Sequence, residues 1–166
     1  QYERFILSQL LVMALKGVPA FYLPALLASE NDIKSFSMTG QRRDLNREKF
    51  KLDNLLSVLN NPESNANKNL KYLRNAMDVR SNLKQFHPSS EMKCLSKGRS
   101  DIVVIKRGKG PKSIFAIHNM ADNKINYQLN DKDLPEIIDN DFNMQDFLTS
   151  TKYNWKNISL DPFQVI

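Results

Sequence analysis

The chain has 166 residues, 41% of them hydrophobic and 25% charged, with 24 Lys and Arg against 18 Asp and Glu. This length and apolar content fit one packed domain, or one domain and part of another, and exclude wholesale disorder. One cysteine, Cys94, and two widely separated histidines, His87 and His118, exclude a disulfide-stapled scaffold and give no zinc-ligand spacing, so we expect no metal and no cofactor.

The first two predicted elements are a helix and a strand, both buried. Residues 2–16 are apolar at most positions of a helical pattern, which is typical of a helix buried on most sides, and Gly17 supplies the usual stop. Residues 18–23 form a short apolar run between Gly17 and Pro24, as expected of a strand buried on both faces in a parallel sheet. A helix followed directly by such a strand predicts an α/β architecture.

A polar segment and two further helices follow. Residues 29–48 contain Gly40 and show no clean period, so we expect a long loop at the carboxyl end of the strand, where parallel α/β folds build their sites. Leucines at helical spacing predict a short helix over residues 52–59. A longer helix is predicted over residues 65–84, with Ser64 as its cap.

The pattern changes to short β-type runs after His87-Pro88. These runs alternate with turn signals at 108–111 and 122–123 and predict a small antiparallel sheet or sandwich. The expected domain boundary lies near residues 86–90. The predicted strands are residues 92–95, 102–105, 114–117, 125–129, 147–149 and 158–160.

Neither a membrane span nor a nucleic-acid interface is expected. The apolar stretch over residues 5–28 is long enough to raise the question of a span, but Lys16, Gly17 and two prolines interrupt it. No signal-peptide pattern is visible, and we expect a cytoplasmic protein. Basic side chains are concentrated before residue 113, which would suit a phosphate-rich partner. They are scattered singly, without a basic helix face or interleaved aromatic residues, so we expect no nucleic acid.

Two strings near the N-terminus resemble a known family. GVPAFYLPALLASEND at residues 17–32 and TGQRRDLNRE at residues 39–48 resemble, in this order, segments of the sucrose phosphorylase group within the α-amylase superfamily, glycoside hydrolase family thirteen. In that group a GVPxxY segment is the eighth strand of a (β/α)8 barrel, and a loop with a GRDINR-like string follows it. Further along, NLKQFHP, SIFAIHNM and LDPFQVI are similar to the group's last barrel helix and C-terminal β-domain.

The resemblance implies a fold class of α/β plus all-β. Residues 1–88 would be the C-terminal end of the catalytic barrel, holding the last βα unit or units of a (β/α)8 TIM barrel. Residues 89–166 would be a small antiparallel β-sandwich. Because a complete barrel needs about 250 residues, we expect an incomplete barrel and self-association through its exposed remnant.

The resemblance also implies an activity for the complete enzyme. Such enzymes transfer a glucosyl unit from sucrose or a related α-glucoside to inorganic phosphate, with retention, and give glucose 1-phosphate. Retention needs two carboxyl groups about 5–5.5 Å apart, and in the family these lie on earlier barrel strands. Glu30, Asp32 and Asp44 offer no convincing substitutes, because a loop carboxylate is more often solvated or capping a helix. We therefore expect no catalytic residue in this chain, and no activity of the chain alone.

Arg43 is the one substrate-binding residue that the resemblance implies. Alignment of RDLNR with the family's RDINR places Arg43 on the arginine that binds the 4-hydroxyl of the glucosyl unit in the −1 subsite. A planar guanidinium suits this role because it offers several fixed donors. Arg43 and Asp44 could equally be a structural pair that fixes the loop. Arg42 stands where the family usually has a small residue, which leaves the acceptor open.

Structural roles are expected for the other candidate side chains. His118 is predicted to be a satisfied mid-strand residue, and His87 to cap or orient the interdomain turn. Trp155 and Tyr153 are expected to pack the β-domain rather than stack on a sugar. Cys94 is expected to be an inert buried thiol.

Two other functions stay open on the sequence. The first is a fragment of an α-glucosidase or transglycosylase of the same superfamily, because upstream loops decide between water and phosphate. The second is a stand-alone basic interaction domain, which would bind nucleic acid in a salt-sensitive way.

Overall fold

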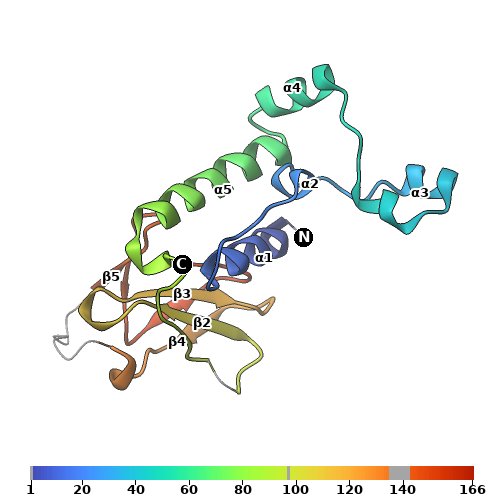
Figure 1. Cartoon of the computed structure of the whole chain (residues 1–166). Helices are drawn as coiled ribbons and strands as arrows, with labels where there is room; N and C mark the ends of the chain where they lie inside the picture. The colour runs from blue at the N-terminus through green and yellow to red at the C-terminus, as the bar shows by residue number, and fades with distance from the viewer. Residues whose placement is uncertain (1, 97, 135–142) are drawn as a thin grey trace. The chain divides into compact units, whose positions relative to one another are not determined.

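The computed structural model describes residues 2–96, 98–134 and 143–166. The chain divides into two compact units, one formed by the described residues up to Pro19 and from Ala76 onward, the other by Ala20–Asn75. Figure 1 shows the elements, which are α1 (Tyr2–Ala14), α2 (Leu23–Leu26), α3 (Ile33–Thr39), η1 (Arg42–Asn46), α4 (Leu52–Asn60), α5 (Asn65–Asn82), η2 (Lys84–Phe86), β1 (Met92–Cys94), β2 (Ile102–Arg107), η3 (Gly110–Lys112), β3 (Ile114–Asn119), β4 (Ile125–Tyr127), η4 (Asp131–Asp133), β5 (Asn143–Gln145), β6 (Lys152–Asn154) and β7 (Ile158–Leu160).

The β-strands of the first unit are all paired antiparallel, as expected. β1, β2 and β3 form a three-stranded sheet with β2 in the middle, so that Ile105 lies opposite both Cys94 and Ala116. The C-terminal residues continue this sheet beyond β3, because Ile117 and Ile166 exchange both backbone hydrogen bonds, at 2.9 and 3.0 Å. β4 pairs with β7, and β5 with β6. The grouping of these strands into a sandwich stays a prediction.

Five of the six predicted strands are confirmed, and the one over residues 147–149 is wrong. The Asp146 carboxylate accepts hydrogen bonds from the backbone N–H of Leu148, at 2.9 Å, and from the hydroxyl of Thr149. These bonds fold the segment into a turn between β5 and β6. Neither of these two strands was predicted from the sequence.

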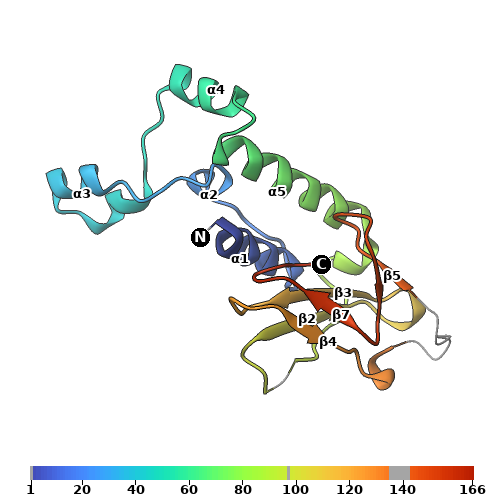
Figure 2. The ribbon, with the colours of Figure 1, turned by 180° about the vertical axis from the view of Figure 1, so that it is seen from behind.

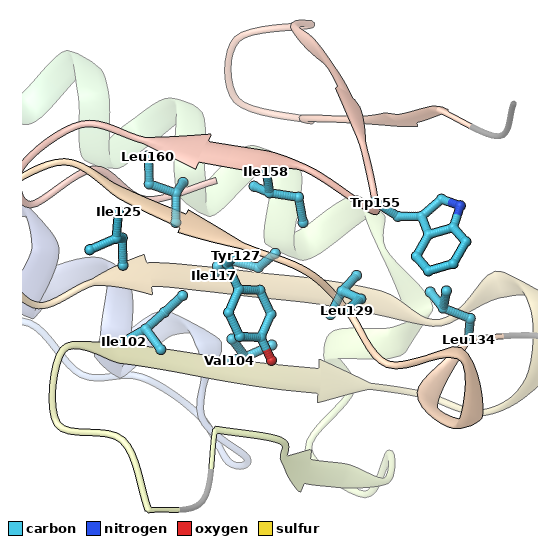
Figure 3. Packing of buried hydrophobic residues seen from close by; sticks show 10 residues of the cluster. All are labelled: Ile102, Val104, Ile117, Ile125, Tyr127, Leu129, Leu134, Trp155, Ile158 and Leu160. Carbon is cyan, nitrogen blue, oxygen red and sulfur yellow. The ribbon is translucent and has the colours of Figure 1, made fainter. Parts of the chain in front are cut away.

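The core of this unit lies between the strand pairs. Aliphatic side chains from β2, β3, β4 and β7 meet there, and Trp155 packs with them at 5% exposure (Figure 3). Burial of each such side chain contributes about 1.5–3 kcal/mol. Tyr153 packs against the same cluster, so the prediction that this aromatic pair packs the β-domain is confirmed. The buried members are Ile102, Val104, Ile117, Ile125, Tyr127, Leu129, Leu134, Trp155, Ile158 and Leu160.

The predicted N-terminal helix is confirmed as α1, but its expected burial on most sides is wrong, because Val12 is 42% exposed. Its buried residues are Leu7, Leu10, Met13 and Ala14, whose spacing places them on one face of a helix, and α1 contacts β3. The last turn of α1 has no basic residue of its own. Side chains from distant parts of the same unit bind its final carbonyl groups instead.

Two arginines cap the C-terminal end of α1. Arg107 on β2 donates from one nitrogen to the carbonyls of Ala14, at 3.1 Å, and Leu15, at 2.7 Å. Arg80 on α5 donates to the carbonyls of Met13 and Gly17. The carbonyls of Met13 and Ala14 are among those that a helix terminus leaves without an internal partner, and those of Leu15 and Gly17 follow the helix directly. Positive charge at this end also favours the helix dipole.

The predicted buried strand over residues 18–23 is wrong. Tyr22 and Leu23 are half exposed, Val18 is 81% exposed, and no described strand pairs with this segment. Leu23 instead begins the short helix α2, with Pro24 in its first turn, a position where the missing proline N–H costs nothing. Pro19 also lacks an N–H for a strand ladder. Before Met92, the described residues therefore form helices and connecting segments without a β-strand.

The second unit contains two expected helices, α4 and the first part of α5, and two α-helices that were not expected, α2 and α3. α4 and α5 confirm the predictions over residues 52–59 and 65–84, and Ser64 Oγ accepts from the N–H of Asn67 at 3.1 Å, as a cap does. The segment expected to be a loop contains α3 and η1. Asp32 caps α3 by accepting from the N–H of Ser35 at 2.9 Å. Gly40 ends α3 with φ of 68°, a conformation that favours glycine.

The two compact units do not coincide with the domain boundary expected near residues 86–90. α1 and the part of α5 from Ala76 onward belong to the same unit as the β-strands. The division at residue 88 refers to a complete barrel and stays a prediction. Within the described residues, no helix combines the length and the apolar character that a bilayer span requires.

Candidate functional site

Arg43 lies in an open hollow on the second unit. Tyr22, which precedes α2, also lines this hollow. Its other lining residues are Arg42 and Asn46 of η1 and Arg47, which directly follows η1. The three arginine side chains are exposed. The loop therefore places three guanidinium groups and one phenol ring around a single depression.

Hydrogen bonds between α3 and η1 hold this loop. The backbone N–H of Asp32 donates to the carbonyl of Leu45 at 2.7 Å, which ties the start of α3 to η1. The Thr39 hydroxyl donates to Asp44 Oδ2 at 2.5 Å and ties the end of α3 to the same turn. The arginines thus extend from a short turn anchored at both ends of α3.

The alternative pairing of Arg43 with Asp44 is wrong for this structure. The Asp44 carboxylate accepts from Thr39, and among the described residues Arg43 makes no ion pair or hydrogen bond through its side chain. The guanidinium is therefore free to bind a ligand.

The charge of the hollow favours oxygen-rich and anionic ligands. Its described lining contains three arginines and no carboxylate. Guanidinium groups bind carboxylates and phosphates with two parallel hydrogen bonds and bind hydroxyl oxygens with one. The side chains of Tyr22 and Asn46 add neutral donors and acceptors to the same surface.

Curated relatives of this chain are glycoside phosphorylases by name. A glucosylglycerate phosphorylase of Allomeiothermus silvanus is 31% identical over 119 residues, covering 72% of this chain and 21% of that protein. One from Spirochaeta thermophila is 37% identical over 62 residues, 37% of this chain and 11% of that protein. One from Escherichia coli is 29% identical over 87 residues, 52% of this chain and 16% of that protein. No protein-family model matches the chain.

The fold is similar to that of a solved enzyme structure. Bacillus licheniformis trehalose-6-phosphate hydrolase superposes with a TM-score of 0.66 at 14% identity, over 98% of this chain and 38% of that chain. The likeness to the solved structure shows the fold, and the match to the phosphorylases indicates the family. The chain is a relative of the sucrose phosphorylase-like enzymes of the α-amylase superfamily, and it resembles their C-terminal part. It spans about a fifth of the length of the Allomeiothermus silvanus phosphorylase.

The loop acids of this sucrose phosphorylase-like chain have structural partners. Asp32 caps α3, and the hydrogen bonds from Ser35 lower the pKa of its carboxyl group. Asp44 is held by Thr39, and Glu30 is exposed. The interpretation of these carboxylates as capping or solvated groups is confirmed. The expectation that the catalytic carboxylates lie outside this chain stays a prediction.

Two of the structural interpretations need correction. Cys94 is exposed rather than buried, because it lies on β1, the edge strand of its sheet. His118 is buried in β3 as predicted, but both of its ring nitrogens lack a hydrogen-bond partner, so it is not a satisfied sheet residue. His87 Nδ1 bonds the Ser89 hydroxyl at 2.7 Å in the turn after η2, as expected of an orienting residue.

The resemblance predicted a role for Arg43, but the sequence did not predict the other residues that line the hollow. Asn46 and Arg47 line the same hollow without having been predicted to do so, and Tyr22 was placed in the buried strand that does not form. The signal available in the sequence was the density of arginine in RRDLNR, where three cations lie within six residues. Such clustering favours an anionic ligand over a solvated face when no acid alternates with them in space.

Proposed function

We propose that this chain is part of a retaining glycoside phosphorylase, which transfers a glucosyl unit from an α-glucoside to inorganic phosphate and releases glucose 1-phosphate. The observation that carries the proposal is the match of 72% of the chain to a phosphorylase at 31% identity. The arginine-lined hollow supports it, because both phosphate and a sugar hydroxyl suit guanidinium donors.

Arg43 is proposed to bind the 4-hydroxyl of the glucosyl unit in the −1 subsite. Its support is the aligned RDLNR string together with an exposed guanidinium that makes no hydrogen bond or ion pair within the described residues. A charged donor to a hydroxyl contributes about 1.5–3 kcal/mol. This contribution corresponds to about 10- to 100-fold in kcat/KM.

The proposed leaving group is glycerate rather than fructose. The three curated relatives are named for glucosylglycerate, and glycerate carries a carboxylate that suits a further guanidinium. Arg42 is adjacent to Arg43 and lines the same hollow. We assign the carboxylate to Arg42, and sucrose is the alternative substrate.

The chain alone is expected to be inactive, so the test uses a chimera. This chain replaces its aligned counterpart in the Allomeiothermus silvanus enzyme, and glucose 1-phosphate is measured with glucosylglycerate and phosphate. Arg43→Ala should lower kcat/KM about 10- to 100-fold. Arg99→Ala, a surface arginine paired with Asp101, is the matched control and should leave kcat/KM unchanged.

The 4-deoxyglucosyl substrate isolates the proposed contact of Arg43. The loss caused by Arg43→Ala should shrink to about twofold with this substrate, since the hydroxyl that Arg43 binds is gone. An equal loss with both substrates would show that Arg43 acts on the loop and not on the sugar. Release of free glucose in place of glucose 1-phosphate would instead support the hydrolase alternative.

A substrate without a carboxylate tests the role proposed for Arg42. With neutral glucosylglycerol, Arg42→Ala should change KM by less than about twofold. With glucosylglycerate it should raise KM about tenfold, the usual cost of one charge-assisted hydrogen bond. Equal effects on both substrates would contradict the carboxylate assignment while leaving the phosphorylase proposal standing.

A further inference from the structure

The position of Arg43 depends on the turn that carries it. Arg43 lies on η1, and within the described residues its side chain makes no hydrogen bond or ion pair. η1 contacts α3, and in both ribbon views the chain after α3 folds back beside this helix (Figure 1 and Figure 2). The bonds between α3 and η1 therefore determine where the Arg43 guanidinium is presented.

Thr39, the last residue of α3, connects this helix to η1 through its hydroxyl group. Its oxygen Oγ1 accepts from the backbone N–H of Gln41 at 3.2 Å and lies 2.5 Å from Asp44 Oδ2. The same oxygen lies 3.0 Å from the carbonyl oxygen of Ser35. A hydroxyl has one proton to donate, and the Asp44 carboxylate, as the closer and charged acceptor, receives it.

Asp44 is also the carboxylate that directly follows Arg43 in the chain. Opposite charges on neighbouring residues attract one another, and an ion pair would occupy donors of the guanidinium. The structure pairs Asp44 with Thr39 instead, and the described lining of the hollow contains Arg43 but no carboxylate. The Thr39 hydroxyl therefore competes with Arg43 for this carboxylate.

We propose that Thr39 is a positioning residue, which keeps Arg43 available to a ligand by holding the Asp44 carboxylate away from it. This inference rests on the proposed function, because it explains why the guanidinium that would bind the glucosyl unit is free. Loss of the hydroxyl releases the carboxylate, which then pairs with Arg43 and competes with an oxygen-bearing ligand.

The reactivity of Arg43 toward phenylglyoxal tests the role of Thr39 on the 166-residue chain, without turnover. This reagent modifies guanidinium groups, an ion pair slows the reaction, and peptide mass spectrometry gives the rate at each arginine. We expect Arg43 to react faster than Arg99, which donates two hydrogen bonds to Asp101. Thr39→Val should lower the rate at Arg43 about threefold, the effect of one surface ion pair.

Three variants separate the release of Asp44 from a general disturbance of the loop. Thr39→Ser keeps the hydroxyl and should retain the original rate at Arg43. The double variant Thr39→Val with Asp44→Asn should recover that rate, because a neutral amide forms no ion pair. Thr149→Val is the matched control, since the Thr149 hydroxyl bonds the Asp146 carboxylate in the first unit, and it should leave the rate at Arg43 unchanged.

The direction of the change distinguishes positioning from support of the loop. A merely loosened loop would leave the rate at Arg43 unchanged or higher, and this result with Thr39→Val would overturn the proposal. A lower rate that persists in the double variant would overturn it as well, because Asp44 would not be the cause. If Thr39→Val fails to fold, Thr39→Ala replaces it in the same series, since alanine at the end of α3 favours the helix.

The phosphorylase chimera gives the matching functional measurement. Thr39→Val should lower kcat/KM about threefold, and it should have no further effect in the Arg43→Ala background, because Thr39 acts through Arg43. Equal losses in both backgrounds would overturn the positioning role. A chimera that releases no glucose 1-phosphate would contradict the proposed function, and the reactivity of Arg43 in the chain would then decide the role of Thr39.

Discussion

Arg107 is the largest fully buried side chain in the described structure. Its guanidinium bonds the carbonyls of Ala14 and Leu15 and, through its other terminal nitrogen, the carbonyl of His87 at 3.1 Å. It also lies over the ring of Phe86, 5.4 Å from the centroid. Burial lowers the pKa of Arg107, with a smaller contribution from Arg80. The side chain therefore links β2, α1 and the turn after η2.

Replacing Arg107 should destabilise the chain strongly. Arg107→Met keeps the apolar stem but leaves one buried and two partly buried carbonyls without their donor, and we expect the free energy of unfolding to fall by about 3 kcal/mol. Arg99→Met removes a surface ion pair with Asp101 and a cation–π contact with Tyr127 at 5.7 Å, and should cost about 1 kcal/mol. Urea unfolding of both variants gives the comparison. Equal losses would show that the bonds of Arg107 contribute no more than a surface pair.

His118 gives the stability of the chain a specific pH dependence. Its pKa is about 4 in the folded chain against an ordinary value of 6.5, so between these values the unfolded chain binds a proton that the folded chain does not. The stabilisation is complete above pH 6.5 and is lost as the pH falls toward 4, by about 3 kcal/mol at most. His118→Leu should remove this part of the acid sensitivity. Identical slopes in urea titrations of the two proteins would contradict this prediction.

Elements with a self-contained pattern could be predicted from the sequence. The helices α1, α4 and α5 and five of the strands follow from periodicity and from caps such as Ser64, because the residues that set those signals are local. The strand expected over residues 18–23 failed because an apolar run specifies burial without specifying a partner. Asp32 is a typical helix-capping residue and could have indicated the start of α3. The segment was predicted to be a loop because its composition is polar.

The site was predictable only through the resemblance. Position 43 of the chain was singled out by the aligned RDLNR string, whereas the meeting of Tyr22 with η1 depends on tertiary geometry. The two bonds that set this geometry join Asp32 to Leu45 and Thr39 to Asp44, and neither is marked by a periodic pattern.

The C-terminal segment should act as a further strand of the β3 sheet. The N–H groups of Ile117 and Asn119 donate to the carbonyls of Ile166 and Gln164, each at 2.9 Å. Deletion of residues 164–166 should accelerate hydrogen exchange of these two amides about tenfold or more. The amide of Leu95, which bonds Val104 on the other side of the sheet, is the internal control. Unchanged exchange at Ile117 and Asn119 would show that the segment does not protect β3.

At the scale of the whole molecule, apolar exposure is concentrated in the second unit. Its exposed large side chains include Leu52 at 68%, Leu56 at 48% and Val58 at 44%, all on α4. α1, by contrast, buries its apolar face within the first unit. We therefore expect self-association of the chain to involve the exposed side chains of α4 rather than those of α1.

Polar substitutions on α4 test this assignment. The double variant Leu52→Ser with Leu56→Ser should reduce self-association of the chain, because it removes two exposed leucines from one surface. Asn54→Ser, at another exposed position of the same helix, is the control. Sedimentation velocity over a range of concentrations gives the readout. A wild-type chain that stays monomeric at high concentration, or a double variant that associates as strongly as the control, would contradict the prediction.

The contact between Arg107 and α1 also determines when the C-terminal end of this helix can be capped during protein synthesis. The donor and the Ala14 carbonyl are 93 residues apart, and ribosomes add roughly 5–20 residues per second. The nascent helix therefore waits about 5–20 s after its own translation before its C-terminal end can be bound. During that interval β3, the strand that α1 contacts, has not yet been synthesised, so chaperones that recognise emerging apolar segments would meet α1 before β3 does.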